Sequence, residues 1–134
     1  MKDPKDVIIL VVDDDPVLKL ILVHEFKSKD FKVLAASSGN EAIRLVQQNK
    51  IDIILSDIQM PDGDGLELLD AIKKIAPKVP VLLFMSGFSN ITPEEAIKRG
   101  AYAILPKPFE RAVLQEIINN ILRNELDKLN KTVP

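Results

Sequence analysis

The chain has 134 residues, 46% of them apolar and 28% charged, with a formal net charge of −2, which fits one globular domain and excludes a disordered or fibrous chain. It contains no cysteine and one histidine, His24, which excludes disulfides, thiolate metal sites and sites built from several imidazoles. The balanced charge gives no electrostatic reason to bind nucleic acid, and no apolar run approaches the roughly 20 residues that a membrane span needs.

The first part of the chain predicts strand, helix, strand and helix in turn. Residues 7–12 are continuously aliphatic, as in a strand that is buried on both faces. Pro16 follows where the first turn of a helix tolerates proline, and apolar residues then recur at helical spacing over residues 17–29. Residues 31–36 predict a second strand. The segment 38–41 is a capping box, a serine followed by a glutamate three positions later, and predicts the start of a second helix.

The rest of the chain continues the alternation. The further expected strands are residues 51–57, 79–85 and 102–105. The further expected helices are residues 66–75, a short helix that opens at the capping box 92–95 and stops at Gly100, and a last helix from about 109 to about 129. Five strands alternating with five helices imply an α/β fold. We expect a doubly wound, flavodoxin-like, five-stranded parallel sheet of strand order 2-1-3-4-5, in which ligands bind at the carboxyl ends of the strands.

Charged and polar residues gather where these strands end. Asp13 and Asp14 follow the first strand, Asp57 ends the third, Ser86 follows the fourth and Lys107 follows the fifth. Neighbouring strands lie about 4.8 Å apart, so several carboxylates converge at one edge and their mutual repulsion calls for a cation. Hard oxygen ligands suit Mg²⁺, and the Lys107 ammonium supplies a second positive charge. A carboxylate beside Mg²⁺ indicates phosphoryl transfer, with Asp57 as the nucleophile.

Four motifs stand in register on this architecture. They are Val-Val-Asp-Asp-Asp-Pro at 11–16, Asp-Ile-Gln-Met-Pro-Asp-Gly-Asp-Gly at 57–65, Ser86, and Lys-Pro-Phe at 107–109. Each motif alone is weak, but together they resemble the receiver domain of two-component response regulators over about residues 6–122.

The resemblance implies a phosphorylation site and a metal site. Asp57 would accept a phosphoryl group from a histidine of a partner, either a sensor histidine kinase or a histidine phosphotransfer protein. Asp14, Asp57 and the backbone carbonyl of Gln59 would hold Mg²⁺, with Asp13 helping through water. Gln59 and Phe88 would flank the phosphate site and tune how fast water removes the phosphoryl group.

The resemblance also implies a switch. Ser86 and Lys107 would contact the acyl phosphate and move the adjoining loops, which shifts the surface of the fourth helix, fifth strand and fifth helix that binds a downstream protein. Such a cytoplasmic regulator catalyses only its own phosphorylation and dephosphorylation. The bond between Lys107 and Pro108 is usually cis in this family. This sequence departs from the family at Ile104, where an aromatic switch residue usually stands; Tyr102 is expected on the same face by strand alternation.

The end of the chain is interpreted separately. We assign residues 6–122 to the receiver domain and residues 123–134 to an extension of the last helix and a tail. The last helix is expected to cover the sheet with five apolar residues, Val113, Leu114, Ile117, Ile118 and Ile121. Beyond this core stripe, a heptad-like pattern follows that is formed by Leu122, Leu126, Leu129 and Val133. The pattern is too short for a coiled coil on its own, which leaves open a homodimer through the last helix. We expect no room for an output domain, so the output would come from a partner protein or from sequence outside this chain.

Other interpretations of the same residues carry less weight. A Mg²⁺-dependent phosphatase would need a second carboxylate two residues after its nucleophile, and that position is Gln59. A receiver that only docks partners would not need intact acids and a lysine, and a flavin phosphate would be repelled by the acids after the first strand. We interpret Asp15, Asp62 and Asp64 as turn and helix-start residues rather than ligands.

Overall fold

The computed structural model describes residues 2–76, 80–87 and 91–126, and it confirms the α/β architecture. The strands are β1 (Ile8–Val12), β2 (Lys32–Ala36), β3 (Ile53–Asp57), β4 (Val81–Ser86) and β5 (Ala103–Pro106). They form one parallel sheet in the expected order 2-1-3-4-5. The helices are α1 (Pro16–Ser28), α2 (Gly39–Gln48), α3 (Gly65–Ile75), α4 (Pro93–Lys98) and α5 (Arg111–Asn120). A 3-10 turn, Pro4–Asp6, precedes the sheet and a π-helical turn, Ile121–Leu126, follows α5.

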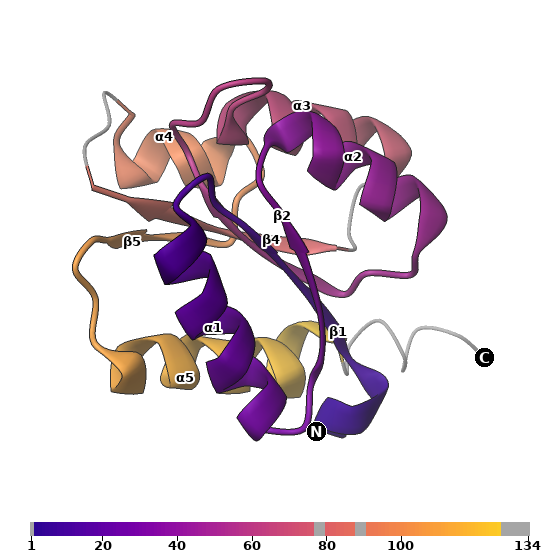
Figure 1. Ribbon diagram of the computed structural model, residues 1–134. Coiled ribbons are helices and arrows are strands. Elements are labelled where there is room, and N and C mark those ends of the chain that lie inside the picture. Colours follow the sequence, from indigo (N-terminus) through magenta and orange to yellow (C-terminus); the bar gives the residue numbers. More distant parts are fainter. Residues whose placement is uncertain (1, 77–79, 88–90, 127–134) are drawn as a thin grey trace.

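The helices cover both faces of the sheet. Figure 1 shows α1 and α5 on one face, and α2, α3 and α4 on the other. Right-handed crossovers between parallel strands produce this arrangement, because each helix must pass over the sheet to reach the start of the next strand. All five strands therefore end at the same edge, where the chain crosses from sheet to helix.

Side-chain caps fix the starts of four helices. Asp15, Ser38, Asp64 and Thr92 each accept a hydrogen bond from a backbone N–H in the first turn of α1, α2, α3 and α4, respectively. Both predicted capping boxes are thus helix starts. Glu110 stands before α5 without such a bond, and this helix begins two residues later than expected.

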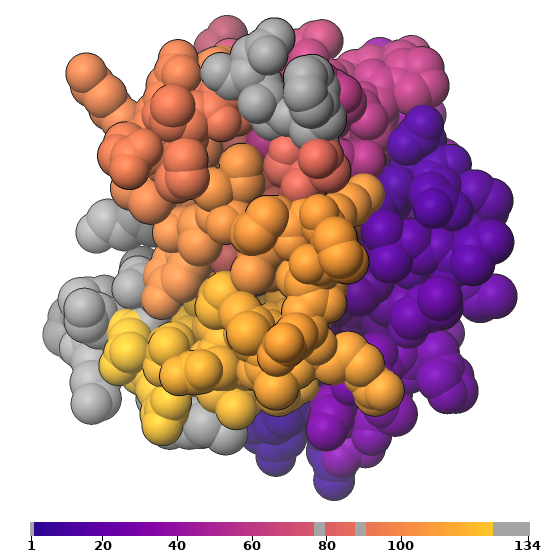
Figure 2. Space-filling model, turned by 90° about the vertical axis from the view of Figure 1, so that its left-hand side faces the viewer, coloured from indigo at the N-terminus to yellow at the C-terminus, as the bar shows by residue number. Residues whose placement is uncertain are grey.

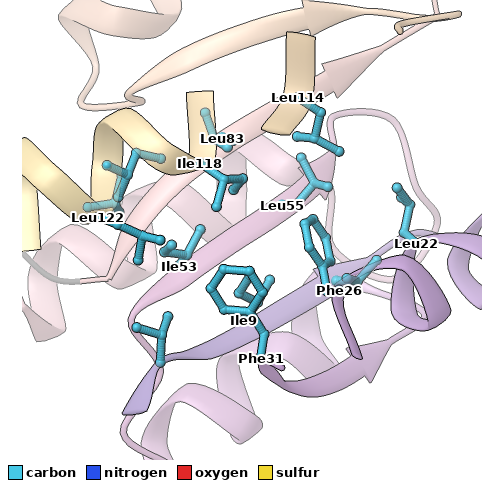
Figure 3. Close-up of a cluster of buried hydrophobic side chains, with 14 of the residues drawn as sticks. Ile9, Leu22, Phe26, Phe31, Ile53, Leu55, Leu83, Leu114, Ile118 and Leu122 are labelled. Atoms are coloured by element: carbon cyan, nitrogen blue, oxygen red, sulfur yellow. The ribbon is translucent and has the colours of Figure 1, made fainter. Parts of the chain in front are cut away.

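Two apolar layers hold the helices against the sheet. Figure 3 shows the layer under α1 and α5, where Phe26 and Phe31 meet edge to face at 6.0 Å between ring centroids. The second layer, under α2, α3 and α4, includes Phe84, which is fully buried. A large apolar side chain that is fully buried in these layers contributes roughly 1.5–3 kcal/mol to the stability of the fold. These layers fix β1 beside β3 with Val12 opposite Ser56, so the residues that follow the two strands lie side by side.

The face assignment of Tyr102 from strand alternation was wrong. Ile104 packs against the layer under α2, α3 and α4, whereas Tyr102 packs against the layer under α1 and α5. Alternation requires extended strand geometry, and β5 begins only at Ala103, so the rule does not reach Tyr102.

The last helix differs from its expected form in two ways. It is α-helical only to Asn120, then forms the π-helical turn, and its predicted continuation from residue 127 lies outside the described residues. Its apolar stripe is also rotated from the expected one: Val113, expected in the core, is 42% exposed, and Leu122, expected beyond the core, is 1% exposed. None of the helices in the described part of the chain is both long and apolar enough to cross a membrane.

Candidate functional site

Three carboxylates meet at the carboxyl edge of the sheet. Asp13 and Asp14 follow β1 and Asp57 ends β3, and one ligand oxygen from each lies within 4.8 Å of the other two. Asp13 is fully buried, Asp57 is half-buried and Asp14 is exposed. Among the described residues this is the group of acids that could hold a metal ion.

Lys107 supplies a positive charge from the far side of this cluster. Its Nζ lies 3.2 Å from Asp13 Oδ2 and 3.3 Å from Asp57 Oδ2, so one ammonium bridges the ends of β1 and β3. Its backbone N–H donates to the Ser86 carbonyl at 2.7 Å, which ties the loop after β5 to the end of β4. The bond between Lys107 and Pro108 is cis, as the family resemblance implied.

Backbone contacts hold the two inner acids in place. Asp13 Oδ1 accepts a hydrogen bond from the Asp15 N–H at 2.9 Å, and the Asp13 N–H donates to the Ala36 carbonyl at 3.1 Å. On β3, the buried Ser56 hydroxyl donates to the Asp57 carbonyl at 2.8 Å. The bond from Asp15 holds one oxygen of the Asp13 carboxylate, and Oδ2 of both Asp13 and Asp57 faces the Lys107 ammonium.

The charge balance of the cluster is unfavourable without a cation. Burial raises the pKa of Asp57 above its ordinary value; Lys107 opposes this rise, while the neighbouring charge of Asp13 adds to it. Burial alone would lower the pKa of Lys107, but its hydrogen bond to Asp13 and the charges of Asp57 and Asp13 outweigh burial and raise it. The ionised acids therefore lack full compensation from the protein.

The donor set fits a hard cation. The cluster offers carboxylate oxygens at a half-open edge, with three negative charges facing one ammonium. Oxygen ligands of this kind suit a small divalent ion that keeps part of its water shell. The residues present can therefore hold a metal ion.

The remaining predicted site residues flank this cluster. Ser86 ends β4, is half-buried, and lies on the strand next to Asp57. Gln59 is exposed in the loop after β3, and its side chain is not part of the acid cluster. Phe88, which we expected beside the site, lies outside the described residues.

Close backbone packing at the site was not visible in the sequence. A Cβ on Gly65 would lie 2.5 Å from the Asp57 carbonyl oxygen and 2.9 Å from the Phe84 ring, so glycine is needed for α3 to start directly against the end of β3. Gly87 differs, because a Cβ there would meet only the Lys107 side chain, at 3.9 Å. The motif at 57–65 contains Gly65, but nothing in the motif shows what the missing side chain makes room for.

Comparisons with known proteins agree with this arrangement. The family model described as the response regulator receiver domain matches residues 9–119. The chain is 37% identical over 115 residues to the transcriptional regulatory protein ZraR of Salmonella typhimurium, covering 85% of this chain and 26% of that protein. It is 32% identical over 114 residues to the transcriptional regulatory protein GlrR of Escherichia coli, again covering 85% and 26%. The chain thus spans about a quarter of the length of these curated relatives.

Solved structures give the same result. A CheY-like response regulator receiver domain from Methanospirillum hungatei matches with a TM-score of 0.83 and 25% identity, covering 91% of this chain and 98% of that one. The complex of CheX and CheY with BeF₃ and Mg²⁺ from Borrelia burgdorferi contains a similar chain, with a TM-score of 0.77, 27% identity, and coverage of 88% and 97%. The family match, the shared fold and the acid cluster at the strand ends agree: the chain belongs to the response regulator receiver domain family of two-component signal transduction.

Proposed function

We propose that this receiver domain is a phosphoacceptor switch in which Asp57 takes the phosphoryl group. The observation that carries the proposal is the meeting of Asp13, Asp14 and Asp57 at one edge with Lys107 bridging two of them. An acid that is half-buried, pre-oriented and faced by a fixed cation is suited to nucleophilic attack on phosphorus.

The metal we propose is Mg²⁺. Asp14, Asp57 and the Gln59 backbone carbonyl would hold it, with Asp13 contributing through water. The all-oxygen donor set supports this choice, as does the Mg²⁺ in the related CheY complex. When bound, the ion would neutralise charge on the phosphoryl oxygens during transfer.

The chain's own residues would divide the transfer between them. An Asp57 oxygen forms the new O–P bond while the N–P bond to the donor imidazole breaks, and the leaving nitrogen keeps the electron pair of that bond. Lys107 then contacts a phosphoryl oxygen, because its ammonium already lies 3.3 Å from Asp57 Oδ2. Ser86, at the end of the neighbouring strand, donates its hydroxyl to a second oxygen.

The output would be a change in the surface formed by α4, β5 and α5. Figure 2 shows this surface in salmon, orange and yellow, with α1 adjoining it in indigo. Ile97 of α4 and Val113 of α5 are exposed apolar residues on these elements, 53% and 42% accessible, which a protein partner would cover. Phosphorylation would act by favouring one of two preexisting states of this surface. Ile104 stands where the family usually has an aromatic switch residue, and it packs against the apolar layer under α2, α3 and α4.

The proposed partners are proteins. A sensor histidine kinase or histidine phosphotransfer protein would donate the phosphoryl group, and an unidentified downstream protein would receive the signal. The net charge of −2 supports protein partners over direct contact with nucleic acid. We assign residues 6–122 to the receiver domain and residues 123–134 to a helical extension and tail. We place the protein in the cytoplasm. A homodimer through the last helix stays a prediction.

Intact-mass measurement tests the proposal. Acetyl phosphate with MgCl₂ should add one phosphoryl group to the wild-type chain, and Asp57→Asn should remove that addition. Omitting MgCl₂ should slow the reaction strongly. A wild-type mass that stays unchanged under these conditions would contradict the proposed function.

A further inference from the structure

The loop of residues 58–64, between β3 and α3, contains a turn with a left-handed backbone. It follows Asp57 and contains Gln59, the residue whose carbonyl we propose as a metal ligand. Two successive residues in it are left-handed, Asp62 with φ 57° and Gly63 with φ 92°. Glycine adopts this region freely, but aspartate does so much less often. Contacts that hold Asp62 in place therefore help to stabilise this conformation.

The N-terminus of α2 makes those contacts. The Gly39 N–H donates to the Gly63 carbonyl at 2.8 Å, and the Asn40 N–H donates to the Asp62 carbonyl at 3.2 Å. The first N–H groups of a helix have no partner within the helix, so these two loop carbonyls satisfy donors that would otherwise be left to water. The N-terminus of α2 and the loop of residues 58–64 thus stabilise each other.

The Asn40 side chain adds a contact that does not depend on the backbone. Its Nδ2 donates to Asp62 Oδ1 at 2.9 Å. The two segments also pack closely, since a Cβ on Gly39 would lie 2.5 Å from the Gly63 carbonyl oxygen. At the base of the loop, the Gly65 N–H donates to the Ile58 carbonyl at 2.7 Å. The loop is therefore held at its base by its own backbone bond and at its turn by contacts from α2.

We propose that Asn40 is a positioning residue for the metal site. By holding Asp62, it keeps the loop in the conformation that presents the Gln59 carbonyl beside Asp57. This inference rests on the proposed function, in which that carbonyl is a Mg²⁺ ligand. Groups that orient metal ligands typically change affinity 10–100-fold when they are removed. Asn40 is exposed and the backbone bonds from α2 remain without its side chain, so a change of about 3–10-fold is expected.

The far end of α2 offers a matched control. Asn49 is exposed like Asn40, and its Nδ2 donates to the Leu45 carbonyl at 3.0 Å. Asn40→Ala and Asn49→Ala therefore each remove one exposed amide hydrogen bond from the same helix. Only Asn40 contacts the loop, so only its loss should affect the metal.

Titration calorimetry of the full chain with MgCl₂ compares the two variants. Asn40→Ala should raise the Kd about 3–10-fold, while Asn49→Ala should stay within about twofold of wild type. In the metal-free protein, Asn40→Ala should also speed hydrogen exchange at the Gly39 amide, which Asn49→Ala should not. Equal weakening by both variants, or an unchanged Kd in Asn40→Ala, would overturn the inference.

A rescue experiment separates positioning from general destabilisation. Asn40→Asp sets a second carboxylate against Asp62 and should weaken Mg²⁺ binding more than Asn40→Ala does. Combining Asn40→Asp with Asp62→Asn restores an amide–carboxylate pair in the reverse direction. The combined variant should bind Mg²⁺ more tightly than Asn40→Asp alone and within about twofold of Asp62→Asn alone. Absence of this rescue would overturn the role of the side-chain contact.

The same titrations distinguish failure of the proposed metal site from failure of the role proposed for Asn40. A wild-type chain that binds no Mg²⁺ would refute the proposed metal site, and the role of Asn40 with it. A wild-type chain that binds Mg²⁺, with an Asn40→Ala variant that binds equally well, would overturn the role of Asn40 alone.

Discussion

Replacing Lys107 by methionine tests the electrostatics of the site before any phosphorylation. The Lys107 ammonium lies 3.2 Å from Asp13 Oδ2 and 3.3 Å from Asp57 Oδ2. The Asp13 side chain is only 1% exposed, so it loses almost all contact with water and depends on this cation. Lys107→Met keeps most of the side-chain volume and removes the charge, which leaves Asp13 buried beside Asp57 with no counter-charge.

The expected loss can be worked out from these distances. At 3.2 Å and an effective dielectric constant of 20, one ion pair is worth about 5 kcal/mol before desolvation is subtracted. A carboxylate that loses its partner can take up a proton instead, and protonating an ordinary aspartate at pH 7 costs about 4 kcal/mol, which sets a ceiling. Lys107 is itself 23% exposed, so water already weakens the pair. We expect Lys107→Met to lower the free energy of unfolding by about 2–4 kcal/mol without metal.

Urea unfolding followed by circular dichroism in EDTA measures this loss. The slope of the transition should stay the same while the midpoint falls, and the melting temperature should fall by about 4 °C per kcal/mol. Lys98→Met, on the exposed side of α4, is the matched control and should stay within about 0.5 kcal/mol of wild type. Saturating MgCl₂ should narrow the gap between Lys107→Met and wild type, because a bound cation replaces the missing charge. A Lys107→Met variant as stable as wild type in EDTA would refute the idea that this lysine compensates the buried acid.

Three further predictions concern the same edge of the sheet. Gly65→Ala should destabilise the domain by about 1–3 kcal/mol, because the added methyl group would lie 2.5 Å from a backbone oxygen. Gly87→Ala has room for the methyl group and should be neutral or stabilising by up to about 1 kcal/mol. Equal urea midpoints for the two variants would contradict the close packing at the start of α3. Folding raises the pKa of Asp57, so ionisation of this acid opposes folding. Without metal, Asp57→Asn should therefore have a higher free energy of unfolding than wild type above that pKa, and the difference should shrink as the pH falls towards 3.8. A difference in unfolding free energy that grows at low pH would contradict the raised pKa. Asp14→Ala should abolish Mg²⁺ binding in calorimetry but leave urea stability almost unchanged because this side chain is exposed, and retained affinity would remove it from the ligand set.

The position of Asp13 and Lys107 at one edge, despite their distance in the sequence, could be predicted from topology, because parallel strands with right-handed crossovers end at the same edge. The ion pair also needs the long side chain of Lys107, because β4 lies between β5 and β3 in the sheet. The same topology does not reveal which acid is buried. Asp13 and Asp14 are adjacent and chemically identical, yet one is fully buried and the other exposed, because that depends on the turn into α1.

The wrong predictions of which face a residue occupies arose where strand or helix periodicity was applied beyond, or close to, the end of the strand or helix. Tyr102 lies one residue before β5, and its backbone does not follow the two-residue alternation of the strand. Val113 and Leu122 lie near the two ends of the last helix, where the late start and the π-helical turn change which face meets the sheet. The contact between Asn40 and Asp62 could not be predicted, because it joins two segments far apart in the sequence. The Pro-Asp-Gly run at 61–63 indicates a turn with left-handed residues, but it does not show what the turn contacts.

Chemical trapping of the phosphorylated residue tests the central claim most directly. After treatment with acetyl phosphate and MgCl₂, sodium borohydride reduces an aspartyl phosphate to homoserine, and peptide mass spectrometry then locates the change. We expect homoserine at Asp57 and no conversion at Asp13 or Asp14. Conversion at either neighbouring acid, or phosphorylation that leaves Asp57 unmodified, would contradict it.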